Sequence, residues 1–215
     1  MDVNAPLSLP EAYVLLEGSR ADAHEIVFLA LVELVERGGA ALVEVPGGDG
    51  GERAFSAADP DRVRARPLAA LAGLIAEAAE EIGPGRDDVP TADIRSRFVR
   101  KWGSAERFAR DEVWRSLAER GLASVQPTTL DALFAVHSFH LTPDGEQERA
   151  RLRSAVAGWS EWPHRPAAAL LEAQSHSVLD DDTFDAIDEL EDLITPGDLW
   201  GDIPEVGGPP TTTPR

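Results

Sequence analysis

The chain of 215 residues has no cysteine, and it holds only one methionine and one tyrosine. Without cysteine it has no disulfide, no thiol nucleophile and no zinc site built on thiolates. Its longest apolar run, "IVFLALV" at residues 26–32, is far shorter than the ~20 residues that cross a bilayer. The N-terminus lacks the basic and apolar regions of a signal peptide, so we expect a cytoplasmic protein.

Positive charge is scarce overall, because 39 acidic residues outweigh 20 basic ones and give a formal net charge of −19. Such acidity opposes general nucleic-acid binding, so no nucleic-acid partner is expected. One segment, Arg95 to Arg120, reverses the sign: its 8 basic residues against 4 acidic ones make it locally +4. An anionic partner would have to meet the protein there.

Hydrophobic periodicity predicts a mainly α fold, a single compact helical domain with two small β-hairpins that follow helices. Helix patterns with capping signals begin at Ser8 and Asp22, and end near glycine. Further helix patterns cover residues 67–82, 91–103, 104–120, 145–159, 164–179 and 183–194. Strands are expected in "AALVEV" (40–45), "LASVQ" (122–126) and "LFAVHSFHL" (133–141).

Two segments echo one another: "LVERGGAALVEV" (34–45) and "LAERGLASVQ" (117–126). Each ends a helix on Glu-Arg-Gly and continues into a short strand. The same pattern occurs in winged-helix regulators, but a net charge of −19 disfavours that interpretation.

Catalytic and metal motifs are weak in this sequence. The glycine-rich "PGGDGGE" (46–52) has no following Lys-Ser/Thr, so it reads as a turn and not as a phosphate loop. His137 and His140 are three apart in a predicted strand, which points them to opposite faces and disfavours a metal site. We therefore expect no enzyme, no catalytic residue, no metal and no cofactor.

The predicted helix over residues 104–120 contains a more specific pattern of basic residues. At 100° per residue, Arg107, Arg110 and Trp114 fall within about 60° of one another on one helix face. One interpretation is a solvated face with i,i+4 ion pairs such as Arg107 with Asp111. The other is an anion site, because arginine binds phosphate bidentately and tryptophan favours an interface that is wet on one side.

Five segments in this order resemble the Golgi phosphoprotein 3 family: "LSLPEAYVLL", "ALVELVERGGAALVEV", "RSLAERGLASVQ", "LFAVHSFHLTPD" and "AVAGWSEWPHRPAAALLEAQSHSVL". The resemblance covers roughly residues 7–194, and the composition looks like that of a bacterial member. It implies a non-enzymatic, mainly helical domain. Family members of the Golgi bind phosphatidylinositol 4-phosphate on the membrane surface and hold cytoplasmic tails of glycosyltransferases.

The resemblance also implies site residues. The two family arginines that hold the phosphate fall on Arg107 and Arg110, while the family's tryptophan and its other arginine are unmatched, with Gly18 and Val27 near those positions. A hydrophobic hairpin used for membrane contact and self-association falls on Phe134 and Phe139.

Together these observations predict a helical domain over residues 1–195 and a disordered, acidic Pro/Gly/Thr-rich tail over residues 196–215. The expected function is a peripheral adaptor at the inner face of a membrane, which binds an anionic lipid or another phosphorylated ligand. The alternative is a soluble protein-interaction module of the same fold. A protein partner and a homo-oligomer are compatible with either.

Overall fold

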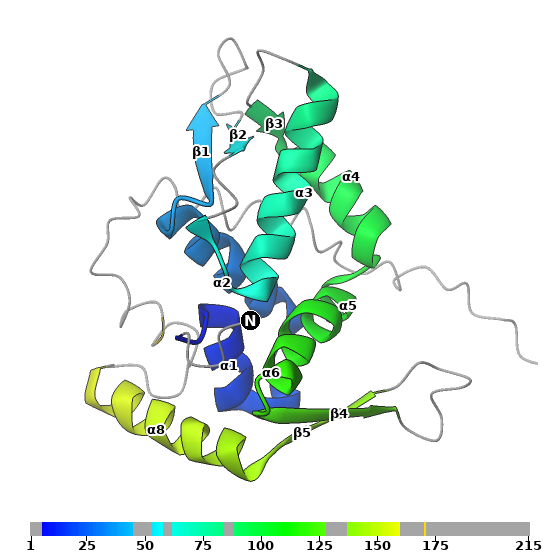
Figure 1. The fold of residues 1–215 in the computed structure, drawn as a ribbon. Coiled ribbons are helices and arrows are strands. Elements are labelled where there is room, and N and C mark those ends of the chain that lie inside the picture. The colour runs from blue at the N-terminus through cyan, green and yellow to red at the C-terminus, as the bar shows by residue number, and fades with distance from the viewer. Residues whose placement is uncertain are drawn as a thin grey trace, which may run out of the picture.

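The computed structural model describes residues 6–44, 53–57, 62–83, 88–127, 137–159 and Leu170. The helices are α1 (Leu9–Glu17), α2 (Ala23–Glu36), α3 (Arg66–Ile82), α4 (Thr91–Trp102), α5 (Ala105–Phe108), α6 (Arg115–Glu119) and α8 (Pro143–Trp159), with short η1 (Gly18–Arg20) and the π-helical turn η3 (Ala109–Trp114). The strands are β1 (Ala40–Glu44), β2 (Arg53–Ala57), β3 (Asp88–Pro90), β4 (Ala123–Pro127) and β5 (His137–Leu141). Helices dominate the described residues, which confirms the predicted mainly α class (Figure 1).

Both predicted hairpins follow a helix, as expected. Strand β4 pairs antiparallel with β5, with Val125 opposite Phe139. Strand β1 pairs antiparallel with β2, but the first sheet has a third strand, because Phe55 of β2 also pairs with Val89 of β3. The sequence prediction missed β3, since three residues that end in proline are too short to show an alternating pattern.

The two Glu-Arg-Gly helix ends adopt the same backbone geometry. Gly38 and Gly121 have φ of 67° and 74°, a left-handed conformation that glycine adopts without steric cost. At the first end the N–H of Gly39 donates to the carbonyl of Leu34, and at the second the N–H of Leu122 donates to that of Leu117. Both are Schellman caps, and they turn the chain from helix into strand.

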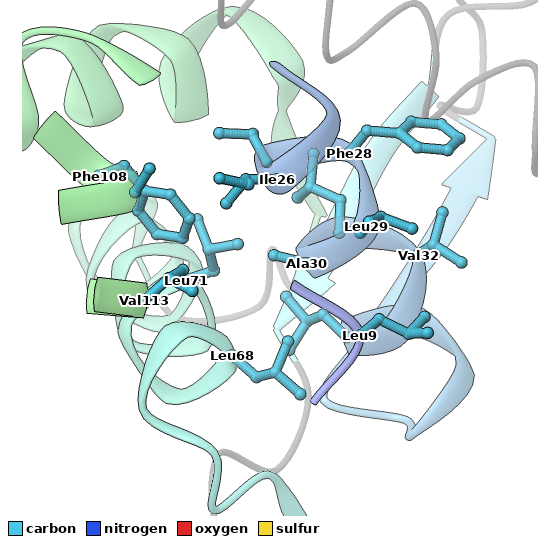
Figure 2. Packing of buried hydrophobic residues seen from close by; sticks show 14 of the residues in the cluster. Leu9, Ile26, Phe28, Leu29, Ala30, Val32, Leu68, Leu71, Phe108 and Val113 are labelled. Atoms are coloured by element: carbon cyan, nitrogen blue, oxygen red, sulfur yellow. The ribbon is translucent and has the colours of Figure 1, made fainter. Parts of the chain in front are cut away.

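Helix α2 lies at the centre of the molecule. All nine residues from Ile26 to Leu34 are buried, and α2 contacts α1, α3 and α5. Figure 2 shows Ile26 of α2 on the side toward Leu71 of α3 and Phe108 at the end of α5. The apolar character of "IVFLALV" on every side is thus explained by burial on every side.

Helix α8 packs against α1 and β5, on the opposite side of the molecule from α4 (Figure 1). No helix among the described residues is long and apolar enough to cross a membrane. Several predictions fall outside those residues: the glycine-rich turn, Phe134 with the start of its strand, the helices predicted over 164–179 and 183–194 apart from Leu170, and the tail over residues 196–215.

Candidate functional site

The candidate site lies on one helical segment, Ala105–Glu119, made of α5, η3 and α6. Ser104 caps its start, since its hydroxyl accepts from the backbone N–H of Arg107 at 3.4 Å. Its inner side buries Phe108, Val113 and Leu117 in the core. The middle of the segment is a π turn, which holds one more residue per turn than an α-helix and often occurs at functional sites.

The Arg107 side chain is exposed on the N-terminal part of this segment. It lies over Gly103, where an added Cβ would be 3.4 Å from its Nη1 atom. Its guanidinium forms no ion pair with any residue that the structure describes, so the expected pair with Asp111 is not made. Arg107 is therefore charged, solvated and free of a described carboxylate.

The Arg110 side chain has a different environment. Both oxygens of the neighbouring Asp111 carboxylate accept from it, Oδ1 from Nε at 2.7 Å and Oδ2 from Nη2 at 3.2 Å. This pair lies at an open pocket of about 310 Å³ between η3, α6 and β4. The pocket is lined by Arg110, Asp111, Arg115, Ala118 and Val125.

Trp114 contacts the second hairpin. Its ring packs on that of Phe139 in β5, with centroids 5.2 Å apart, and neither Trp114 nor Arg107 lines the pocket of Arg110. The structure thus brings Arg110, but not Arg107 or Trp114, to the pocket. That the three side chains share one helix face stays a prediction.

Phe139 also differs from the expectation. Only 6% of its surface is exposed, so it belongs to the core, and the prediction that it is a membrane-contact side chain is corrected. The reason is the register of the β4–β5 ribbon, which turns Phe139 toward Trp114. Phe134, the other predicted contact residue, lies outside the described residues.

The basic segment Arg95–Arg120 divides into two halves. From residue 95 to 107 there are five basic residues and one acidic residue, a charge of +4; from 108 to 120 there are three of each, a charge of zero.

Ion pairs also differ between the two halves. In the second half Arg110, Arg115 and Arg120 pair with Asp111, Glu119 and Glu11. In the first half, Arg97 pairs with Glu81 on α3. The basic side chains of this half that form no ion pair with a described residue are Arg95, Arg100, Lys101 and Arg107. All of the excess positive charge thus lies at the end of α4 and the start of α5.

The junction between α4 and α5 is held by an aromatic cluster and a carboxylate. The rings of Phe98, Trp102 and Phe108 lie 4.9 to 5.6 Å apart. The Glu112 carboxylate accepts from Trp102 Nε1 at 3.2 Å and from Arg66 Nε at 3.0 Å. These contacts connect α4 and α3 to η3. The backbone that carries the basic side chains at the end of α4 and the start of α5 is therefore held in place.

A second polar cluster, which the sequence analysis missed, lies at the N-terminus of α1. The buried Glu11 carboxylate accepts from the backbone N–H of Ser8 at 2.8 Å and from the Ser116 hydroxyl at 2.6 Å, and it pairs with Arg120 at 3.4 Å. The Ser-x-x-Glu capping box (residues 8–11) was the sequence signal that could have revealed it.

The buried Glu33 carboxylate completes this cluster. It accepts from the Leu9 N–H at 2.6 Å and pairs with Arg37. Burial raises its pKa from 4.5 to about 7, against the opposing effects of Arg37 and the Leu9 N–H. Arg37 and Arg120 are the arginines of the two Glu-Arg-Gly ends, so both repeated ends pair with carboxylates around α1. This cluster holds the helices together.

Within the described ranges, no group of three or more His, Asp or Glu side chains is arranged to hold a metal ion. A comparison with models of protein families finds no match, and a comparison with curated proteins finds none either. The resemblance to the Golgi phosphoprotein 3 family therefore stays a prediction from the sequence.

Proposed function

We propose that this protein is a non-enzymatic peripheral adaptor that binds a phosphoinositide or another anionic lipid head group through Arg107 and Arg110. The observation that carries the proposal is the exposed Arg107 guanidinium, which has no ion-pair partner among the described residues although the chain has a net charge of −19. An exposed guanidinium without a carboxylate partner can bind a phosphate. A hydrogen bond to such a charged group contributes ~1.5 to 3 kcal/mol to the free energy of binding.

Arg110 supports the proposal in a second way. It lies one turn along the same helical segment and lines an open pocket together with Arg115. Two guanidiniums on one pocket wall favour an anionic occupant. Asp111 already holds Arg110, so the head group exchanges places with that carboxylate, and the affinity is reduced by the cost of the exchange.

The alternative function, a soluble protein-interaction module, has support of its own. Ala118 and Val125 give the same pocket an apolar part beside its two arginines. An acidic peptide with one small apolar side chain matches this combination. The experiment below separates the two functions, because only the first predicts binding to anionic vesicles.

The experiment measures co-sedimentation with vesicles of three compositions: phosphatidylcholine alone, phosphatidylcholine with phosphatidylglycerol, and phosphatidylcholine with phosphatidylinositol 4-phosphate. We expect binding only to the anionic vesicles, and we expect Arg107→Ala with Arg110→Ala to weaken it. The matched control is Arg151→Ala with Arg153→Ala on α8, which removes the same charge on the far side of the molecule (Figure 1). Equal binding by the two double variants contradicts the proposal.

A further inference from the structure

The end of α4 and the start of α5 form a surface that Arg110 and its pocket do not use. We call it the α4–α5 corner and define it by Arg95, Val99, Arg100 and Arg107. We propose that the α4–α5 corner lies flat on an anionic bilayer, with Val99 entering the interface. This inference rests on the proposed function and names the surface through which the protein meets the membrane.

Val99 is the first observation. It is the one large hydrophobic side chain exposed among the described residues, at 39%. Arg95 lies one helical turn before it on the same face of α4, so a cation lies beside an apolar side chain. This pairing matches a lipid interface, where apolar atoms enter the acyl boundary and arginines remain with the phosphates.

The charge of the corner is the second observation. Its three cations, Arg95, Arg100 and Arg107, form no ion pair with a described residue, while every arginine of the following segment, residues 108–120, has one. A bilayer is a plane of phosphates, so it can contact several exposed cations at once, as a single small anion cannot.

The shape and rigidity of the corner are the third observation. Trp102 and Phe108 pack edge to face, with centroids 5.0 Å apart, beneath the turn at Gly103. Gly103 has φ of 81°, and it brings the end of α4 next to the Arg107 side chain. By contrast, Phe139 of the β4–β5 hairpin is buried, so the corner takes the place that the resemblance assigned to that hairpin.

The absence of cysteine allows a direct test, because one introduced thiol can be labelled uniquely. We label Val99→Cys with the polarity-sensitive fluorophore NBD and add vesicles of phosphatidylcholine with phosphatidylglycerol. The matched control is Ser154→Cys on α8, an exposed position far from the corner (Figure 1). We expect a blue shift and protection from an aqueous quencher at position 99 alone.

A second arm uses charge. Arg95→Gln with Arg100→Gln should lower the vesicle partition coefficient about fivefold per removed cation. Binding of soluble inositol trisphosphate should stay unchanged in this variant, because Arg107 and Arg110 are intact.

The outcomes separate the two proposals. If the protein binds vesicles through Arg107 and Arg110 but the label at position 99 stays in water, the α4–α5 corner is not the contact surface and only this inference is overturned. If it binds neither vesicles nor inositol trisphosphate, the proposed function fails and this inference with it. A blue shift that grows with protein concentration and needs no vesicles identifies a second copy of the chain on this surface, and also overturns the inference.

Discussion

The Asp111 carboxylate accepts two hydrogen bonds from the guanidinium of Arg110, at 2.7 and 3.2 Å, on the wall of an open pocket. The two residues are adjacent in sequence. A carboxylate with two oxygens occupies the fork of an arginine in the same way as a phosphate does. Asp111 is therefore an internal competitor for any anion that binds Arg110.

Removing this competitor should strengthen anion binding. Asp111→Asn keeps the size of the side chain but removes its charge, so we expect its affinity for anionic vesicles to rise several-fold, which is ~1 kcal/mol. Co-sedimentation with phosphatidylglycerol vesicles measures the change. Arg110→Ala with Asp111→Asn serves as the control, since the gain should vanish without the arginine. An equal gain in both variants would mean that Asp111 acts only through general repulsion.

Glu33 should make the protein less stable as the pH rises. Its folded pKa of about 7 lies above the ordinary 4.5, so the folded state holds a proton that the unfolded state has lost. The stabilisation from the protonated side chain is complete below about pH 4.5 and is lost as the pH rises through about 7, by ~3 kcal/mol at most.

The measurement for Glu33 compares chemical denaturation of the wild type and Glu33→Gln over this pH range. The variant keeps an oxygen for the Leu9 N–H but does not titrate. We expect the stability of Glu33→Gln relative to the wild type to increase with pH. A constant difference at every pH would contradict the raised pKa.

Two arginines of the same helical segment should differ strongly in their effect on stability. Arg120 pairs with the buried Glu11, whereas Arg115 is 65% exposed and pairs with the exposed Glu119. Arg120→Ala leaves a buried carboxylate without its cation and should cost ~3 kcal/mol or more. Arg115→Ala should cost less than ~1 kcal/mol. Thermal unfolding of both variants tests this, and equal melting temperatures would refute the buried role of Arg120.

Phe139 should behave as a core residue. It is 6% exposed and packs on Trp114, so Phe139→Ala should lower the free energy of unfolding by ~3 kcal/mol or more. Val99→Ala, an apolar truncation at an exposed site, is the control and should leave the melting temperature nearly unchanged. If Phe139→Ala instead kept the wild-type melting temperature and lost vesicle binding, the hairpin would be the membrane contact after all.

The acidic end of the chain should weaken binding at low salt. Residues 180–215 carry 11 acidic residues and one basic residue. A tethered anion reaches an effective concentration in the millimolar range, enough to compete for the cations near Arg107. Deleting residues 197–215 should therefore increase vesicle binding, and more so at low ionic strength. No change on deletion would show that this segment does not reach the basic surface.

The sequence alone determined the parts of this protein that depend on short-range patterns. The caps at Ser8 and Asp22, the buried helix around "IVFLALV" and the glycine stops at Gly38 and Gly121 all follow from local rules, and the structure confirms each of them. The two strands that follow the Glu-Arg-Gly ends belong to the same group. Local sequence is sufficient there, because capping and periodicity act within a few residues.

The tertiary structure decided which charges are free and which apolar side chains are exposed. The partners of Arg66, Arg97 and Arg120 lie 46, 16 and 109 residues away, on other helices. The ring of Trp114 packs on that of Phe139, and the β4–β5 ribbon buries Phe139. No local pattern contains these facts, because an ion pair or a buried ring depends on which distant segments share the same space.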